Sequence, residues 1–166
     1  PVVELLDDDH IKYFQHSGVF KDDNINWIVY SLYEHNQRPE FNKSIDGEIN
    51  VGLFHGPIQG LKTDLGFDFG HEAYDTDKFL GLDIVLCGDI HKRSEFLIPG
   101  GKKGYMIGST IQQGFGENVF KHGYGVYEID SDNYRYVDLK NPKPFLSFYM
   151  NSIDNLVEGT EKLVNY

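Results

Sequence analysis

The chain has 166 residues, of which 40% are hydrophobic and 14% aromatic, so its length suits one globular domain with a buried core. A formal net charge of -11 argues against a general nucleic-acid coat, because an acidic surface repels a polyanion. No apolar run approaches the roughly 20 residues of a membrane helix, so no membrane span is predicted. No secretory signal pattern opens the chain, and Cys87 has no second cysteine to pair with. These two features predict a cytoplasmic protein.

Strands dominate the predicted elements. Runs rich in β-branched and aromatic residues, separated by Gly, Pro, Asn or Asp, predict strands at 11–20, 26–33, 49–56, 83–89, 95–100, 104–109, 124–130, 134–139 and 144–150. Ser131 to Asn133 are typical of a hairpin turn. Two helices are expected, one over 75–82 capped by Asp75 and one over 151–166 capped by Asn151 or Ser152. The predicted fold class is α/β with a predominance of strand.

Two of the predicted strands end in residues that can bind a metal ion. One delivers His55, and the other delivers Asp89 and His91 after Gly88, which is expected to permit the turn. Asp89 and His91 are two apart, so in an extended segment they point to the same side of the chain. Imidazole and carboxylate ligands suit manganese, iron or zinc, and a pair of such ions can hold both oxygens of a phosphoester displacement.

The other polar residues have plainer interpretations beside the functional ones. Residues 64–89 hold seven acids and one base, whereas 91–103 hold four bases and one acid. Solvated surface is the plainer reading of both, and an acidic metal-binding rim beside a basic patch for phosphate is the alternative. A single histidine is more often a hydrogen-bonded structural residue than a ligand, and this is the expectation for His10, His16, His35 and His71. His122 is interpreted as a loop residue bonded to the backbone, with a role in the site as the alternative.

The order and spacing of four segments resemble a known family. LFHGPI at 53–58, DIVLCGDIHKR at 83–93, IGSTIQQGFGE at 107–117 and KHGYGVYEID at 121–130 resemble the C-terminal half of calcineurin-like metallophosphoesterases. The likeness is to the SbcD-type DNA double-strand-break repair exonucleases and their phage recombination endonuclease relatives, and it covers residues 10–140. It implies the β-rich half of an α/β/β/α sandwich, with residues 1–142 as the C-terminal portion of the domain. Residues 143–166 would then be a last strand and a C-terminal helix or linker.

The same resemblance assigns roles to individual residues. His55 matches the first downstream metal-ligand histidine, His91 matches the final histidine of a Gly-His-x-His motif, and Asp89 replaces the first. His55 and His91 would be catalytic, and all three would be metal ligands. Two divalent ions are implied, with manganese favoured over magnesium, iron or zinc. Residues expected to contact substrate are Lys92, Arg93, Ser109 and His122.

The family's upstream motifs, Asp-x-His, Gly-Asp-x-x-Asp and Gly-Asn-His-Asp/Glu, do not occur ahead of His55. The chain is therefore expected to be completed by the upstream half of the same domain. The implied activity is metal-dependent DNA exonuclease and endonuclease hydrolysis, with DNA and an SbcC-type ATPase subunit as partners and a homodimer as one assembly. Two alternatives stay open: a phosphoesterase acting on a phosphoprotein, a cyclic nucleotide or a small phosphoester, and a non-catalytic scaffold for the ATPase.

Overall fold

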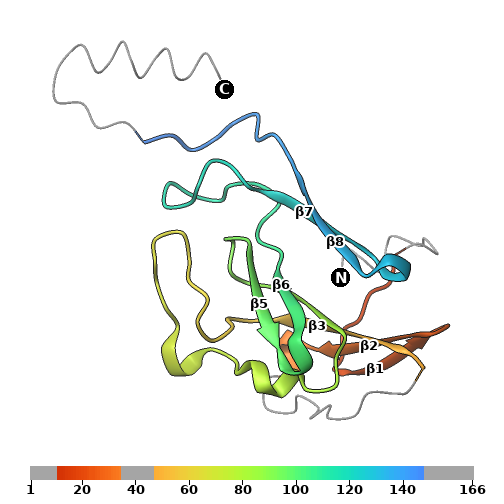
Figure 1. Ribbon diagram of the computed structural model, residues 1–166. Coiled ribbons are helices and arrows are strands. Elements are labelled where there is room, and N and C mark those ends of the chain that lie inside the picture. Colours follow the sequence, from red (N-terminus) through yellow and green to blue (C-terminus); the bar gives the residue numbers. More distant parts are fainter. Residues whose placement is uncertain (1–10, 35–46, 148–166) are drawn as a thin grey trace, which may run out of the picture.

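The computed structural model describes residues 11–34 and 47–147 (Figure 1). The described part is rich in strand, and its helices are short 3-10 turns with no α-helix among them. The strands are β1 Gly18–Asp22, β2 Ile25–Tyr30, β3 Ile49–His55, β4 Ile84–Gly88, β5 Ser94–Ile98, β6 Lys102–Met106, β7 Gly123–Glu128 and β8 Asn133–Asp138. The 3-10 helices are η2 Leu32–Glu34, η3 Gly70–Glu72, η4 Thr76–Phe79, η5 Pro99–Gly101 and η6 Ile129–Ser131.

Six strands form one mixed sheet in the order β1-β2-β3-β4-β6-β5, and β7 and β8 form a separate hairpin. The four inner strands β2, β3, β4 and β6 run parallel, and the edge strands β1 and β5 are antiparallel to their neighbours. Figure 1 shows the hairpin apart from this sheet, on the far side from the connection that carries η3 and η4. The parallel order places the carboxyl ends of the inner strands along one edge of the sheet.

Alternate residues of the inner strands supply two hydrophobic layers, because successive side chains point to opposite faces. On β4, Val85 and Cys87 belong to the larger layer, and Ile84 belongs to the smaller one. The β3–β4 connection covers the larger layer with Ile58 and Phe79, which are both fully buried. Burying one such side chain contributes roughly 1.5–3 kcal/mol. This double coverage explains why β4 reads as a continuous apolar run.

The hairpin covers part of the smaller layer. The rings of Tyr105 on β6 and Tyr134 on β8 stack with their centroids 3.8 Å apart. Tyr127 of β7 also packs against this layer, which includes Val51 and the partly buried Trp27. The hairpin turn is confirmed, since Asp132 takes the left-handed conformation with a φ of 48° after η6.

Several local expectations are confirmed, but the strand predicted at 26–33 ends at Tyr30 and is followed by η2, and other strand predictions also need correction. Asp75 caps η4 by accepting a hydrogen bond from the Asp77 backbone at 3.0 Å, although the helix is a 3-10 turn. Residues 11–17 are not strand, because the main chain there bonds to side chains: Gln15 O accepts from Ser31 Oγ at 2.6 Å. Residues 144–147 are not strand either, since Phe145 bonds to the side chain of Gln112.

The remaining expected strand residues, 148–150, and the helix expected at 151–166 lie outside the described residues, as do His10 and His35. The predicted α/β class agrees with the described part at the level of a mixed, sheet-rich fold with few helices. Among the described residues, no helix has the length and apolar content to traverse a bilayer.

Candidate functional site

The carboxyl edge of the main sheet collects most of the polar residues singled out from the sequence. His55 ends β3 and pairs in register with Gly88 at the end of β4. The pairing continues one step further, because the Gly56 N–H donates to the Gly88 carbonyl at 3.1 Å. The segment after β6 then returns to the segment after β4, since the Ser109 N–H donates to the His91 carbonyl at 3.1 Å. Three neighbouring strand ends therefore converge here.

Gly88 makes room for the imidazole of His55. A Cβ built on Gly88 would lie 3.2 Å from Cδ2 of His55, so the ring lies across the glycine. The sequence interpretation of Gly88 as the turn residue needs correction, because the positive φ falls on the next residue. Asp89 has a φ of 113°, a conformation that a residue with a β-carbon rarely adopts. Backbone strain of this kind costs on the order of 1–3 kcal/mol and clusters at functional sites.

Glu117 holds the imidazole of His91. Nδ1 of His91 donates to Oε1 of Glu117 at 2.7 Å, and the Gln113 N–H donates to Oε2, also at 2.7 Å. Burial raises the pKa of Glu117, but the hydrogen bonds from His91 and Gln113 oppose it, and the resulting pKa lies below its ordinary value. The carboxylate therefore stays charged at neutral pH beside a half-exposed histidine, whose side chain is 42% exposed.

Gly108, Ser109 and His122 form a buried support behind His91. A Cβ on Gly108 would lie 2.7 Å from the His91 carbonyl oxygen, so only glycine allows this approach. Nε2 of His122 donates to the Asn118 carbonyl at 2.5 Å, and its Nδ1 accepts from the Ser109 hydroxyl at 2.9 Å. Ser109 and His122 are both buried, at 7% and 3% exposure. The interpretation of His122 as a residue bonded to the backbone is confirmed.

The two basic residues that follow His91 behave differently. Lys92 is exposed. The Arg93 side chain is 9% exposed and pairs with Asp138, while its guanidinium lies 4.7 Å from the Tyr136 ring centroid. These contacts attach the β4–β5 connection to β8, so the structure gives Arg93 a bracing position between the sheet and the hairpin.

Two clefts open beside His91. The larger, of about 360 Å³, is lined by residues that include Asp64, Leu65, Asp89, His91 and Glu117. The smaller, of about 110 Å³, shares His91, Lys92 and Asp64 with the first and adds Arg93, Lys121 and His122. The connection that carries Asp64 is held in place by the Asn118 N–H, which donates to Asp64 Oδ2 at 3.2 Å. The site is thus a walled recess at the sheet edge.

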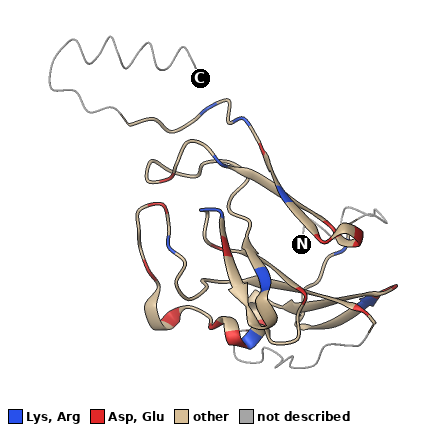
Figure 2. Ribbon diagram, in the orientation of Figure 1, with Lys and Arg blue, Asp and Glu red and all other residues tan. Residues whose placement is uncertain are grey.

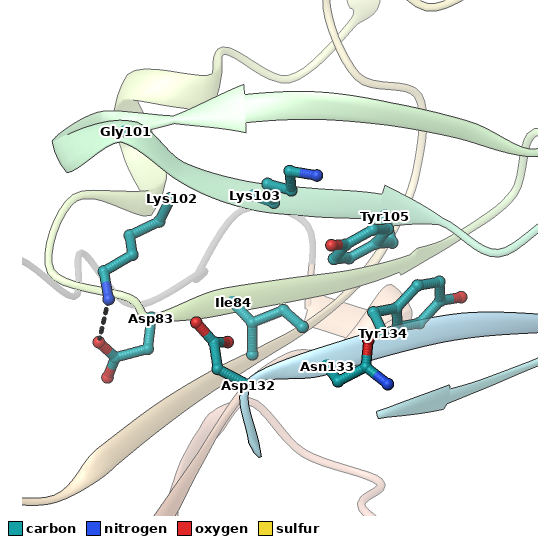
Figure 3. A pocket seen from close by; sticks show the side chains of 9 residues that line it. All are labelled: Asp83, Ile84, Gly101, Lys102, Lys103, Tyr105, Asp132, Asn133 and Tyr134. Carbon is teal, nitrogen blue, oxygen red and sulfur yellow. Dashed lines mark ion pairs between the residues drawn. The ribbon is translucent and has the colours of Figure 1, made fainter. Parts of the chain in front are cut away.

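A third cleft, of about 330 Å³, lies at the opposite, amino end of β4 and β6 (Figure 3). Figure 3 shows Lys102 directed to Asp83, with which it pairs at 3.5 Å. The neighbouring Lys103 pairs with Glu95 at 3.2 Å. Because both lysines are neutralised by carboxylates, this cleft offers little net attraction for a phosphate. In Figure 2 the Lys and Arg residues of the described segments are likewise scattered, without a continuous basic stretch among them.

The expected dinuclear metal centre is not complete within this part of the chain. In residues 11–34 and 47–147, no three His, Cys, Asp or Glu side chains group closely enough to hold a metal ion. His55, Asp89 and His91 have the right donor chemistry for manganese. They do not form a metal-binding group by themselves, so a metal centre here would need ligands from outside the described residues.

Sequence reasoning missed Glu117, Gln112 and Asp64. Glu117 ends the quoted segment IGSTIQQGFGE, but its 26-residue separation from His91 gives no local sign of contact. Gln112 is 2% exposed, a rare burial for a glutamine, and only its long-range partners explain it. Asp64 belonged to the acidic stretch already noted, whose plainer reading as solvated surface does not account for its position at both clefts.

Comparisons with known proteins give one distant relative. No family model matches the chain, and no solved structure matches it. The chain is 28% identical over 137 residues to the "Uncharacterized protein R555" of Acanthamoeba polyphaga mimivirus. The match covers 78% of this chain and 10% of the viral protein, so the chain spans about a tenth of its relative's length. The description of this relative names no activity.

Proposed function

We propose that the chain is part of a metal-dependent phosphodiesterase that hydrolyses DNA in repair or recombination, as an exonuclease and endonuclease. In this proposal the six-stranded sheet is the β-rich half of a calcineurin-like metallophosphoesterase sandwich. The observation that carries it is that His55 ends β3, while Asp89 and His91 follow the adjacent parallel strand β4, so that all three belong to the carboxyl edge of the sheet. Open parallel sheets characteristically bind their ligands at this edge.

The residues of the chain suit this role in distinct ways. His91 and His55 offer imidazole nitrogens and Asp89 offers carboxylate oxygens, the donor types that suit manganese. Bound divalent ions would polarise the scissile phosphate and lower the pKa of a bound water. Lys92, exposed beside both clefts, is placed to attract a backbone phosphate. Ser109 and His122 are buried and hydrogen-bonded to each other, so they support the segment that carries His91, and His122 also lines the smaller cleft.

The test is hydrolysis of end-labelled DNA with Mn²⁺, using the longest polypeptide of the natural reading frame that contains the chain. We expect His91→Ala to remove most of the activity, since the groups of one catalytic site act together. His71→Ala is the matched control, because His71 is an exposed imidazole in η3 that lines neither cleft beside His91. Equal hydrolysis by the wild type and His91→Ala would refute the proposal.

A second function has its own supporting observation. The absence of three grouped ligands among the described residues favours a non-catalytic scaffold for an SbcC-type ATPase. This alternative predicts that the full-length protein binds the ATPase subunit but hydrolyses no DNA, phosphoprotein or small phosphoester with any of Mn²⁺, Mg²⁺, Fe²⁺ or Zn²⁺. Screening these substrates with the same polypeptide therefore separates the nuclease from both alternatives.

A further inference from the structure

The contacts of Glu117 determine the protonation pattern of the His91 ring. A carboxylate can only accept hydrogen bonds, so the 2.7 Å contact between Glu117 Oε1 and His91 Nδ1 requires the hydrogen on Nδ1. In a neutral imidazole the other nitrogen, Nε2, then carries the free lone pair. The described residues place no hydrogen-bond partner on Nε2 of His91. That nitrogen is therefore available to bind a cation or accept a proton.

Glu117 is itself fixed from two directions. Its second oxygen, Oε2, accepts the Gln113 N–H at 2.7 Å, so both oxygens are occupied and the carboxylate cannot rotate freely. Its carbonyl accepts from Nε2 of Gln112 at 3.1 Å. The same Gln112 amide binds both main-chain groups of Phe145, donating to the carbonyl at 3.0 Å and accepting from the N–H at 2.8 Å. The buried glutamine thus ties Glu117 to the segment that follows the hairpin.

We propose that Glu117 is a positioning residue, which holds the His91 ring in the Nδ1–H tautomer and keeps the Nε2 lone pair ready for the proposed site. The value of this role for catalysis rests on the proposed function, but the tautomer of His91 follows from the contact with Glu117 whatever the function is. Carboxylates that orient a ligating histidine in this way characteristically change metal affinity or activity by about 10- to 100-fold when removed.

The chain contains a matched pair for comparison. Nδ1 of His16 contacts Oε1 of Glu34 at 2.9 Å, which repeats the geometry of the His91–Glu117 pair. The His16 side chain is 71% exposed, and neither residue lines the clefts beside His91. Glu34→Gln therefore perturbs the same kind of pair without touching the proposed site.

The experiment is a two-bond ¹H–¹⁵N correlation spectrum, recorded at alkaline pH, of the ¹⁵N-histidine-labelled polypeptide that is used for the hydrolysis assay. We expect the Nδ1–H tautomer of His91 to predominate in the wild type, and Glu117→Ala to lose that preference. Glu117→Gln keeps one acceptor oxygen but turns its amide donor toward either His91 or Gln113, so an intermediate result is expected. Glu34→Gln should leave His91 unchanged. The His122 signals report whether each variant has folded.

The outcomes separate this inference from the proposed function. A folded Glu117→Ala chain that keeps the Nδ1–H tautomer, or a wild type with the hydrogen on Nε2, would overturn the positioning role. In the longer polypeptide with Mn²⁺, Glu117→Ala should lower the rate of DNA hydrolysis by about 10- to 100-fold. An unchanged rate despite a lost tautomer preference would also overturn it. No hydrolysis by the wild type would refute the proposed function, while the tautomer shift would still support the assignment of Glu117.

Discussion

Replacing Gly108 with alanine should destabilise the fold by pressing a methyl group against the main chain of His91. Gly108 has a φ of 81°, where a residue with a β-carbon costs about 1–2 kcal/mol. The new Cβ would lie 2.7 Å from the His91 carbonyl oxygen, and overpacking of this kind costs about 1–3 kcal/mol. Alanine also lowers the conformational entropy of the unfolded chain relative to glycine, which stabilises the folded state by about 0.4–1 kcal/mol. The net loss in the free energy of unfolding is therefore roughly 1–5 kcal/mol.

Gly66→Ala is the matched control for this measurement. Gly66 has the same φ of 81°, but a Cβ built on it would meet nothing within 4 Å. The difference between the two variants therefore isolates the contact with His91, at about 1–3 kcal/mol. For a chain of this length that corresponds to a melting temperature lower by roughly 2–12 °C in Gly108→Ala. Urea unfolding followed by the fluorescence of Trp27, the single tryptophan, gives the free energies. Equal stabilities would show that Gly108 does not lie against His91.

Two further predictions concern backbone strain and acid stability. Asp89→Gly should be more stable than Asp89→Ala by about 1–2 kcal/mol, because glycine adopts a φ of 113° freely; equal urea midpoints would contradict the strain at Asp89. Hydrogen bonds from Lys21 and Asn26 lower the pKa of Glu48 in the folded state. The stabilisation that the Glu48 carboxylate contributes is therefore complete above the ordinary glutamate pKa of about 4.3, and it is lost as the pH falls through the lower pKa of the folded state. Unfolding free energies measured from pH 7 down to acid should therefore fall less steeply in Glu48→Gln than in the wild type, and parallel curves would refute the assignment.

Local pattern was enough to predict most strands but not how they assemble. β2, β3 and β4 were found because their apolar runs fill both faces of a sheet, and the hairpin and the Asp75 cap have signals within a few residues. The strand predicted at 144–150 has a suitable aromatic composition. In its described part, however, the side chain of Gln112 takes the main-chain groups that a strand partner would need. Because Gln112 lies 33 residues before Phe145 in the sequence, this hydrogen bonding could not be predicted from the local pattern.

The candidate site divides in the same way. His55, Asp89 and His91 could be chosen as candidates from the sequence because they lie at the ends of apolar strands, and parallel pairing places these strand ends at one edge of the sheet. The residues that support them could not, since their partners are distant in sequence: His91 to Glu117 spans 26 residues and Arg93 to Asp138 spans 45. The basic side chain of Arg93 suggested a phosphate contact, but its neighbours engage it in bracing the hairpin.

The arrangement around His91 bears on the choice between a nuclease and a scaffold. A scaffold needs a stable surface, and a glycine at position 89 would supply the same turn without the strain that Asp89 carries. The strained Asp89 and the His91–Glu117 pair both lie beyond the end of β4, beside clefts of about 360 and 110 Å³. Preorganised polar groups in an open recess suit catalysis and agree with the proposed nuclease, whereas the lack of three grouped ligands among the described residues agrees better with the scaffold.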